Sequence, residues 1–194
     1  MPQVCVMSSV PPSIAGPVSL TLDLSRLRGD PQDFPYAPAL LGSLFVASIA
    51  LDLVIGQALG QGDNALAHSL MSGTLVLALC WIALRVRGLG ARYVQTASAL
   101  VACSLLMSLV QLPLALLFVA PDAGDSAATQ PSVAPSALQV LVSIGFLATL
   151  GWQMVVYAYI MRHAMQATFA FALTLVVTWV VASIAIEQIL FAAA

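Results

Sequence analysis

Long apolar segments separated by short polar ones dominate the chain from residue 38 onward. They occupy residues 38–59, 65–85, 93–119, 136–161 and 167–191. Each has the roughly 20 residues that an α-helix needs to cross the roughly 30 Å hydrocarbon core of a bilayer. The pattern therefore predicts an all-α, integral membrane bundle of five transmembrane helices, with residues 38–194 forming one transmembrane domain.

The first 37 residues have a different pattern. Residues 1–17 contain four prolines and lack the basic residues and apolar core of a signal peptide, which predicts a disordered start. Residues 18–28 place Leu20, Leu24 and Leu27 on one helical face, typical of a short amphipathic helix lying on a membrane surface. The same leucine-rich stretch also fits a strand, but a lone strand beside a bilayer has no partner for its edge. A proline-rich connector follows at residues 30–38.

The composition favours a bilayer over water as the solvent. Hydrophobic residues make up 61% of the chain and charged residues 7%, whereas about a quarter of an ordinary soluble domain is charged. The net charge of -2 does not indicate a nucleic-acid partner. Every basic residue is arginine, and Ala, Leu and Val are abundant, which is typical of a GC-rich bacterial genome. We expect a multi-pass protein of a bacterial inner membrane, with membrane lipids as partners.

The arginines lie on alternate connectors. Arg26 and Arg28 precede the first apolar segment, Arg85, Arg87 and Arg92 join the second to the third, and Arg162 joins the fourth to the fifth. The other connectors contain Asp63, Asp122 and Asp125 but no basic residue. Basic residues favour the cytoplasmic side, so the N-terminus is expected in the cytoplasm and the C-terminus in the periplasm. Arg85, Arg87, Arg92 and Arg162 are the predicted topology anchors.

Asp52 is the most informative single residue. It lies about 14 residues into the first apolar segment, or roughly 21 Å at about 1.5 Å per residue. A carboxylate at such a depth costs roughly 2.5 to 3.5 kcal/mol, so it should face the bundle and find a partner. Ser48, Asp52, Gly56 and Gly60 form a polar and small stripe, which favours close approach of helices. Asp52 is either a proton or substrate relay, or a hydrogen-bonded fastener between helices.

Three further polar residues share the outer half of the predicted membrane with Asp52. These are His68, Gln111 and Glu187, placed there by depth alone. Depth does not establish contact, because the rotation of each helix about its axis is unknown. If the four faces converge, they form a polar pocket open to the outside; if they do not, His68 and Glu187 are solvated at helix ends.

Common catalytic and cofactor-binding patterns are missing from the sequence. It contains no Gly-x-Ser-x-Gly, Walker A or dinucleotide-binding pattern and no Cys-x-x-Cys pair. Its two histidines, His68 and His163, fall on opposite faces of the predicted membrane and cannot ligate one metal ion. We therefore expect no catalytic residues, no metal site, no cofactor and no enzymatic activity.

The connector Arg28-Gly29-Asp30-Pro31-Gln32-Asp33-Phe34-Pro35-Tyr36, followed by Ala39-Leu40-Leu41, resembles the opening of small uncharacterised proteobacterial inner-membrane proteins. The layout of a cytoplasmic N-terminus, a proline-containing connector and five helices with short turns is similar to the Yip1 family. The resemblance implies a membrane organiser that binds partner proteins, and it carries no catalytic residues over.

The predicted function is that of an interaction or accessory component of the membrane, which binds other membrane proteins or a second copy of itself. The main alternative is a small transporter or proton-coupled channel subunit that uses Asp52 and Glu187. A lipid-acting membrane enzyme is a third class, which would need a convergent pocket of titratable groups.

Overall fold

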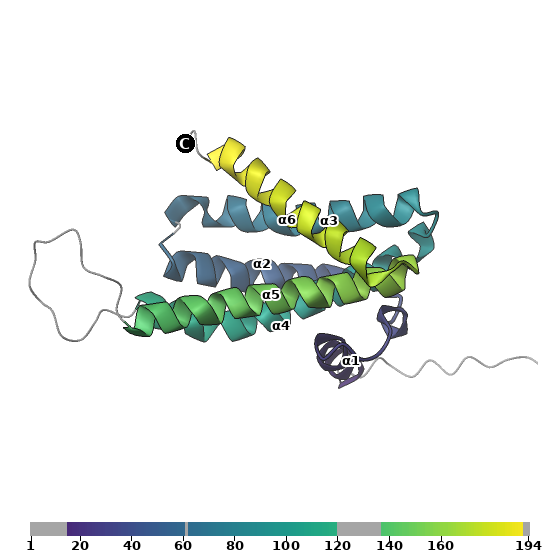
Figure 1. The fold of residues 1–194 in the computed structure, drawn as a ribbon, viewed down its shortest axis with the longest axis horizontal. Helices are drawn as coiled ribbons and strands as arrows, with labels where there is room; N and C mark the ends of the chain where they lie inside the picture. The colour runs from purple at the N-terminus through teal and green to yellow at the C-terminus, as the bar shows by residue number, and fades with distance from the viewer. Residues whose placement is uncertain (1–14, 61, 120–136, 192–194) are drawn as a thin grey trace, which may run out of the picture.

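The computed structural model describes residues 15–60, 62–119 and 137–191 (Figure 1). The described residues are mostly helical and contain no strand. The helices are α1 (Ala15–Ser25), α2 (Pro38–Ala58), α3 (Ala65–Val86), α4 (Tyr93–Val119), α5 (Ala137–Met165) and α6 (Phe169–Phe191). Within the described ranges, the five from α2 to α6 are long and apolar enough to cross a membrane, which confirms the predicted spans and indicates a multi-pass membrane protein. The expected disorder of residues 1–17 is wrong for residues 15–17, which form the first turn of α1, and residues 1–14 fall outside the described residues.

The main boundary difference is at the end of α5, which runs to Met165 instead of the predicted 161. Gln166 then takes a left-handed conformation with φ 51°. The Ala167 amide donates to the Arg162 carbonyl (3.0 Å) and the Gln166 amide to the His163 carbonyl (3.3 Å). This is the Schellman pattern, which glycine usually marks. Because the left-handed position is occupied by Gln166 and not by glycine, the sequence contains no recognisable signal for the end of α5.

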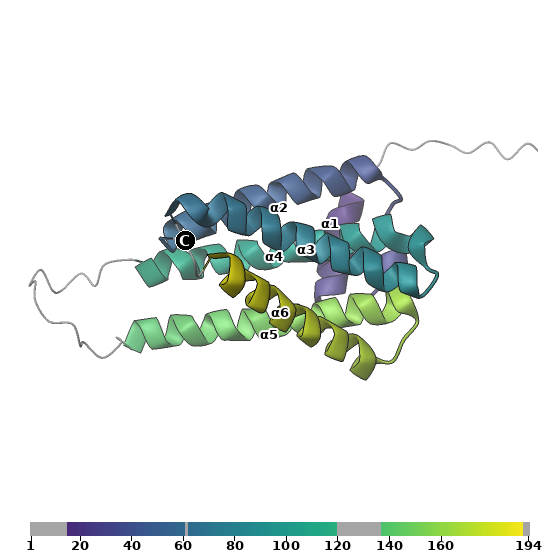
Figure 2. The same cartoon turned by 90° about the horizontal axis from the view of Figure 1, so that it is seen from above.

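The five long helices close into a ring in the order α2, α3, α6, α5, α4 (Figures 1 and 2). Within this ring α4 is the most enclosed helix: 39% of its most apolar stretch is buried, against 17% for each of the others. It packs along both α2 and α5. The ring encloses a space to which every long helix presents one face.

The end of the bundle that carries the α3–α4 and α5–α6 turns is closely packed. Its buried core combines Leu84 of α3 and Leu100 of α4 with Val156, Ile160 and Met161 of α5. Small side chains allow the helices to approach here. Ala97, Ser98, Ala99, Ala158, Ala164 and Ala172 are all fully buried. This end therefore holds the five helices at fixed distances from one another.

The N-terminal segment is part of this packed end. α1 is helical, as predicted, and crosses α4 and α5 (Figure 2). Leu24 is buried and Leu20 and Leu27 pack against the core, so the apolar face contacts the bundle and is not left for a membrane surface. The indole of Trp152 donates to the Ser25 carbonyl at 3.0 Å and fastens the end of α1 to α5.

The proline-rich connector is also a built structure. The Asp30 side chain accepts from the Gln32 amide (2.9 Å) and caps a short 3-10 turn, Pro31–Asp33. The amide of Gln95 on α4 donates to the carbonyls of Gln32 and Phe34, both at 3.0 Å. Phe34 itself is 1% exposed. The connector thus fixes how the chain enters α2.

Candidate functional site

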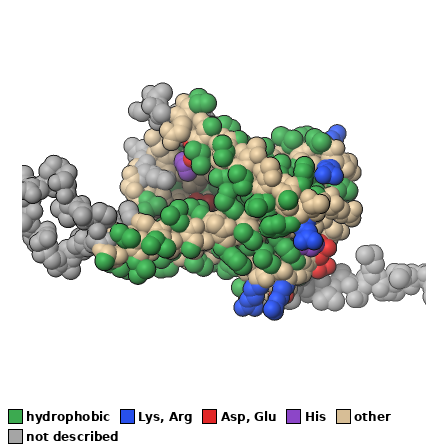
Figure 3. Space-filling view, viewed as in Figure 1, with side chains coloured by type: hydrophobic (Ala, Val, Ile, Leu, Met, Phe, Trp, Pro, Cys, Tyr) green, Lys and Arg blue, Asp and Glu red, His purple; other side chains and the backbone are tan. Residues whose placement is uncertain are grey.

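A cavity of about 710 Å³ lies inside the ring, and all five long helices contribute to its lining. The lining combines apolar side chains with hydroxyls, amides, one imidazole and two carboxylates. His68 lies one turn into α3 and Glu187 in the last turns of α6, so the charged part of the lining is at the end of the bundle away from the α3–α4 turn. Figure 3 shows histidine and acidic atoms inside a hollow, with the arginines gathered at the other end.

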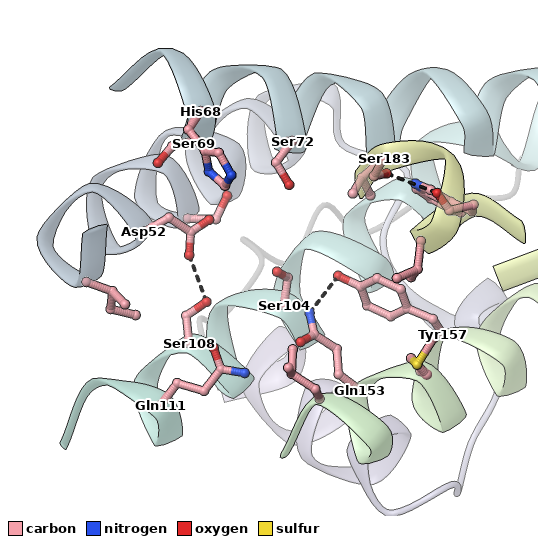
Figure 4. A pocket seen from close by; sticks show the side chains of 18 of the residues that line it. Asp52, His68, Ser69, Ser72, Ser104, Ser108, Gln111, Gln153, Tyr157 and Ser183 are labelled. Carbon is pink, nitrogen blue, oxygen red and sulfur yellow. Dashed lines mark hydrogen bonds between the residues drawn. The ribbon is translucent and has the colours of Figure 1, made fainter. Parts of the chain in front are cut away.

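Asp52 projects from α2 into this cavity (Figure 4). The Ser108 hydroxyl on α4 donates to its Oδ1 at 2.9 Å, so the carboxylate has a partner on a neighbouring helix. His68 of α3 lies beside it in Figure 4 and is close enough to interact with its charge. The hydrogen bond fits the fastener hypothesis, while the position in the cavity fits the relay hypothesis.

His68 and Glu187 form an ion pair across α3 and α6. The distance from His68 Nε2 to Glu187 Oε2 is 3.2 Å, and the side chains are 36% and 25% exposed. The pair is charged on both sides only when the imidazole is protonated. The imidazole of His68 therefore lies near two carboxylates, those of Asp52 and Glu187. The three residues come from three different helices.

Gln111 completes the set of four residues predicted from depth. It lines the cavity from α4, three residues after Ser108. Its side-chain nitrogen is buried and has no hydrogen-bond partner among the described residues. A buried donor without a partner is uncommon in native structures and is a position that a bound molecule could satisfy. All four predicted residues thus reach one cavity.

Further polar residues line the cavity beside the four that were predicted from depth. On α5, the Gln153 amide donates to the Tyr157 hydroxyl at 3.2 Å (Figure 4). The remaining hydroxyls come from Ser48, Ser69, Ser72, Ser104 and Ser183. On α4, Ser104, Ser108 and Gln111 recur at i, i+4 and i+7, a polar stripe in the otherwise apolar residues 99–119. That stripe was the signal that could have identified this face.

The small-residue stripe on α2 faces the inside of the bundle. Ser48, Asp52 and Gly56 line the cavity, and Asp52 also accepts a hydrogen bond from Ser108 of α4. Helices α2 and α3 approach closely at Gly73, where an added Cβ would lie 2.8 Å from the Phe45 ring. The predicted contribution of the stripe to close helix packing stays a prediction.

Two of the predicted topology anchors, Arg92 and Arg87, contact other helices at the packed end. Arg92 Nη1 donates to the Ala164 carbonyl at 3.4 Å. The Arg85 guanidinium lies 5.6 Å from the Trp81 ring centre, and that of Arg87 lies 5.0 Å from Phe171. Such cation–π contacts are common where basic and aromatic side chains meet. Arg162 is exposed at the same end.

The oxygen atoms that line the cavity suit a cation or a hydrogen-bond donor. Carboxylate, hydroxyl and amide oxygens accept hydrogen bonds from ammonium or hydroxyl groups. In a serine–histidine catalytic pair the serine hydroxyl donates to the imidazole, whereas Ser108 donates to Asp52. Among the described residues, no group of three or more His, Cys, Asp or Glu has the arrangement of a metal site.

Comparison with other proteins adds no assignment, because no known protein family, curated protein or solved structure matches this chain.

We predict that His68 and Glu187 are energetically coupled. Their interaction should contribute about 0.5–1 kcal/mol to the free energy of unfolding, as is typical of partly exposed ion pairs. The test is a double-mutant cycle with His68→Ala and Glu187→Ala, measuring the free energy of unfolding in detergent. Glu187→Ala combined with His163→Ala is the control, because His163 contacts Tyr159 on α5 and lies at the other end of the bundle. Equal coupling in both cycles would contradict the pair.

Proposed function

We propose that the protein is a small carrier or proton-coupled channel subunit of a bacterial inner membrane, and that its cavity is the solute-binding site. One observation supports this proposal above the others: each of the five apolar helices contributes polar side chains to one cavity of about 710 Å³. Asp52 and Glu187 are the residues proposed to bind the solute or the coupled proton. No catalytic role is proposed for them.

The amount of polar surface favours a binding site over simple fastening. Fastening α2 to α4 requires only the contact between Asp52 and Ser108. The cavity also presents Ser69, Ser72 and Gln111, and a cavity of this size exceeds what a pair of hydrogen-bonded side chains requires. Polar residues within membrane helices that face an internal cavity commonly mark a path for a substrate or ion.

An interaction or accessory role is the second candidate. The first half of α5 supports it, because Leu138, Leu141, Ile144 and Leu147 are all exposed. Another membrane protein or a second copy of this chain could cover that face, although lipid would also do so. The resemblance to Yip1-like proteins points in the same direction.

The proposed orientation has the N-terminus in the cytoplasm and the C-terminus in the periplasm. The arginines gathered at one end of the bundle support it (Figure 3), because basic residues favour the cytoplasmic side. Reporter fusions made after Gly90 and after Ala194 should then give cytoplasmic and periplasmic signals, respectively. The reverse pair of signals would overturn the orientation and move the cavity to the inner half of the membrane.

Asp52→Asn separates the two candidate functions. Asn keeps the oxygen that accepts from Ser108, so abundance and unfolding temperature should stay near those of the wild type. In liposomes loaded with a pH-sensitive dye, a potassium-diffusion potential should drive proton entry through the wild-type protein, and the substitution should slow it at least tenfold.

The matched control is Asp23→Asn, which removes an exposed carboxylate on α1 and should leave proton entry unchanged. Wild-type flux equal to that of protein-free liposomes, together with reduced abundance of the Asp52→Asn protein, would favour the accessory role. Undiminished flux through the variant would remove Asp52 from the proposed path.

A further inference from the structure

The cavity has an opening on the side of the bundle, between α5 and α6. Leu147 and Leu150 of α5 and Ile184 of α6 line the cavity, yet they are 68%, 47% and 52% exposed. Residues that line a cavity and are also exposed stand at its rim. The hollow in Figure 3 lies in this position, between the two helices. The rim is therefore apolar and faces the region that lipid occupies around membrane-spanning helices.

The arrangement of the helices explains why the opening is on this side. α5 and α6 are joined by a short turn at the packed end and diverge away from it (Figures 1 and 2). On its other side, α6 is held to α3 by the pair of Glu187 with His68. The interface between α3 and α6 is thus held together by an ion pair. The gap between α5 and α6 is bordered by aliphatic side chains instead.

The charges inside the opening favour a cation. Among the described residues that line the cavity, Asp52 and Glu187 are acidic, His68 is the one basic side chain, and no arginine is present. With both carboxylates ionised and His68 protonated, the three groups sum to one negative charge. Charges of one sign between low-dielectric walls attract a ligand of the opposite sign. A fatty acid or another anionic amphiphile would meet repulsion at the same place.

We propose that the cavity takes up an amphiphile with a protonated amine head group from within the bilayer, through the gap between α5 and α6. The amine would bind at Asp52, and its hydrocarbon chain would lie against Leu147, Leu150 and Ile184. This inference rests on the proposed function, because it assumes that the cavity binds a solute, and it names the chemical class of that solute. A short water-soluble amine has the same head group but gains nothing from the apolar rim.

Equilibrium binding of radiolabelled dodecylamine tests the proposal on the full chain in phosphatidylcholine nanodiscs, with empty nanodiscs as the background. Propylamine provides the same head group without the chain, and dodecanoate provides the chain with the opposite charge. Dodecylamine should bind saturably and at least tenfold more tightly than either comparator. Asp52→Asn should weaken its binding at least tenfold, and Asp23→Asn should leave it unchanged.

A second pair of variants tests the route. Leu147→Trp enlarges a side chain at the rim, whereas Leu141→Trp enlarges one that is 66% exposed on the same helix but does not line the cavity. The first should slow dodecylamine association at least fivefold, and the second should not change it. Equal rates for the two variants would overturn entry between α5 and α6.

The outcomes separate this inference from the proposed function. If propylamine binds as tightly as dodecylamine and depends on Asp52, uptake from the bilayer is wrong while the cavity remains a solute site. If dodecanoate binds as well as dodecylamine, selection for a cation is wrong. Absence of saturable dodecylamine binding overturns the inference, and the proton-flux measurement still decides the proposed function independently.

Discussion

A carboxylate inside an apolar membrane helix must be kept from the hydrocarbon, and this constraint organises the whole bundle. Asp52 at an intramembrane depth costs roughly 2.5 to 3.5 kcal/mol unless it faces polar groups. The structure meets the constraint with Ser108 on α4 and His68 on α3, and it adds Glu187 on α6 as the partner of His68. Residues from four helices thus surround one site, while leucine and valine side chains remain on the outside.

Close packing at the end with the α3–α4 and α5–α6 turns allows the helices to separate around the cavity at the other end. Buried alanines at Ala97, Ala99 and Ala164 let the helices approach closely where the turns are, and Arg92 ties the start of α4 to the end of α5. Because the helices are fixed at that end, they can diverge at the other without losing their arrangement. The cavity lies where they diverge, which places adaptable surface on a rigid support, as binding sites generally require.

The sequence predicted the parts of this arrangement that depend on one segment at a time. The five spans follow from the length of the apolar runs, and the shared depth of Asp52, His68, Gln111 and Glu187 follows from counting residues along each helix. Their convergence could not be predicted, because the rotation of each helix about its axis is decided by packing against its neighbours. The stripe of Ser104, Ser108 and Gln111 at i, i+4 and i+7 is present in the sequence and indicates the polar face of α4, but it was recognised only from the structure.

The burial of Phe34 and the left-handed conformations of Leu27 and Gln166 depend on tertiary packing and could not be predicted from the local sequence. Phe34 lies in a proline-rich connector and is nevertheless buried, because Gln95 on α4 holds the backbone around it. Leu27 and Gln166 take left-handed conformations at helix ends, where glycine would have been the recognisable signal. In both cases the surrounding contacts override the local preference of the residue.

We expect the polar faces of the spans to enclose a space that water enters. Electron paramagnetic resonance of spin labels in liposomes tests it most directly. A label introduced through Ser72→Cys, which replaces a cavity-lining residue, should collide mainly with a water-soluble nickel chelate. A label introduced through Leu70→Cys, at an exposed residue two positions earlier on α3, should collide mainly with oxygen, which concentrates in lipid. Dominant collision with oxygen at both positions would contradict the cavity.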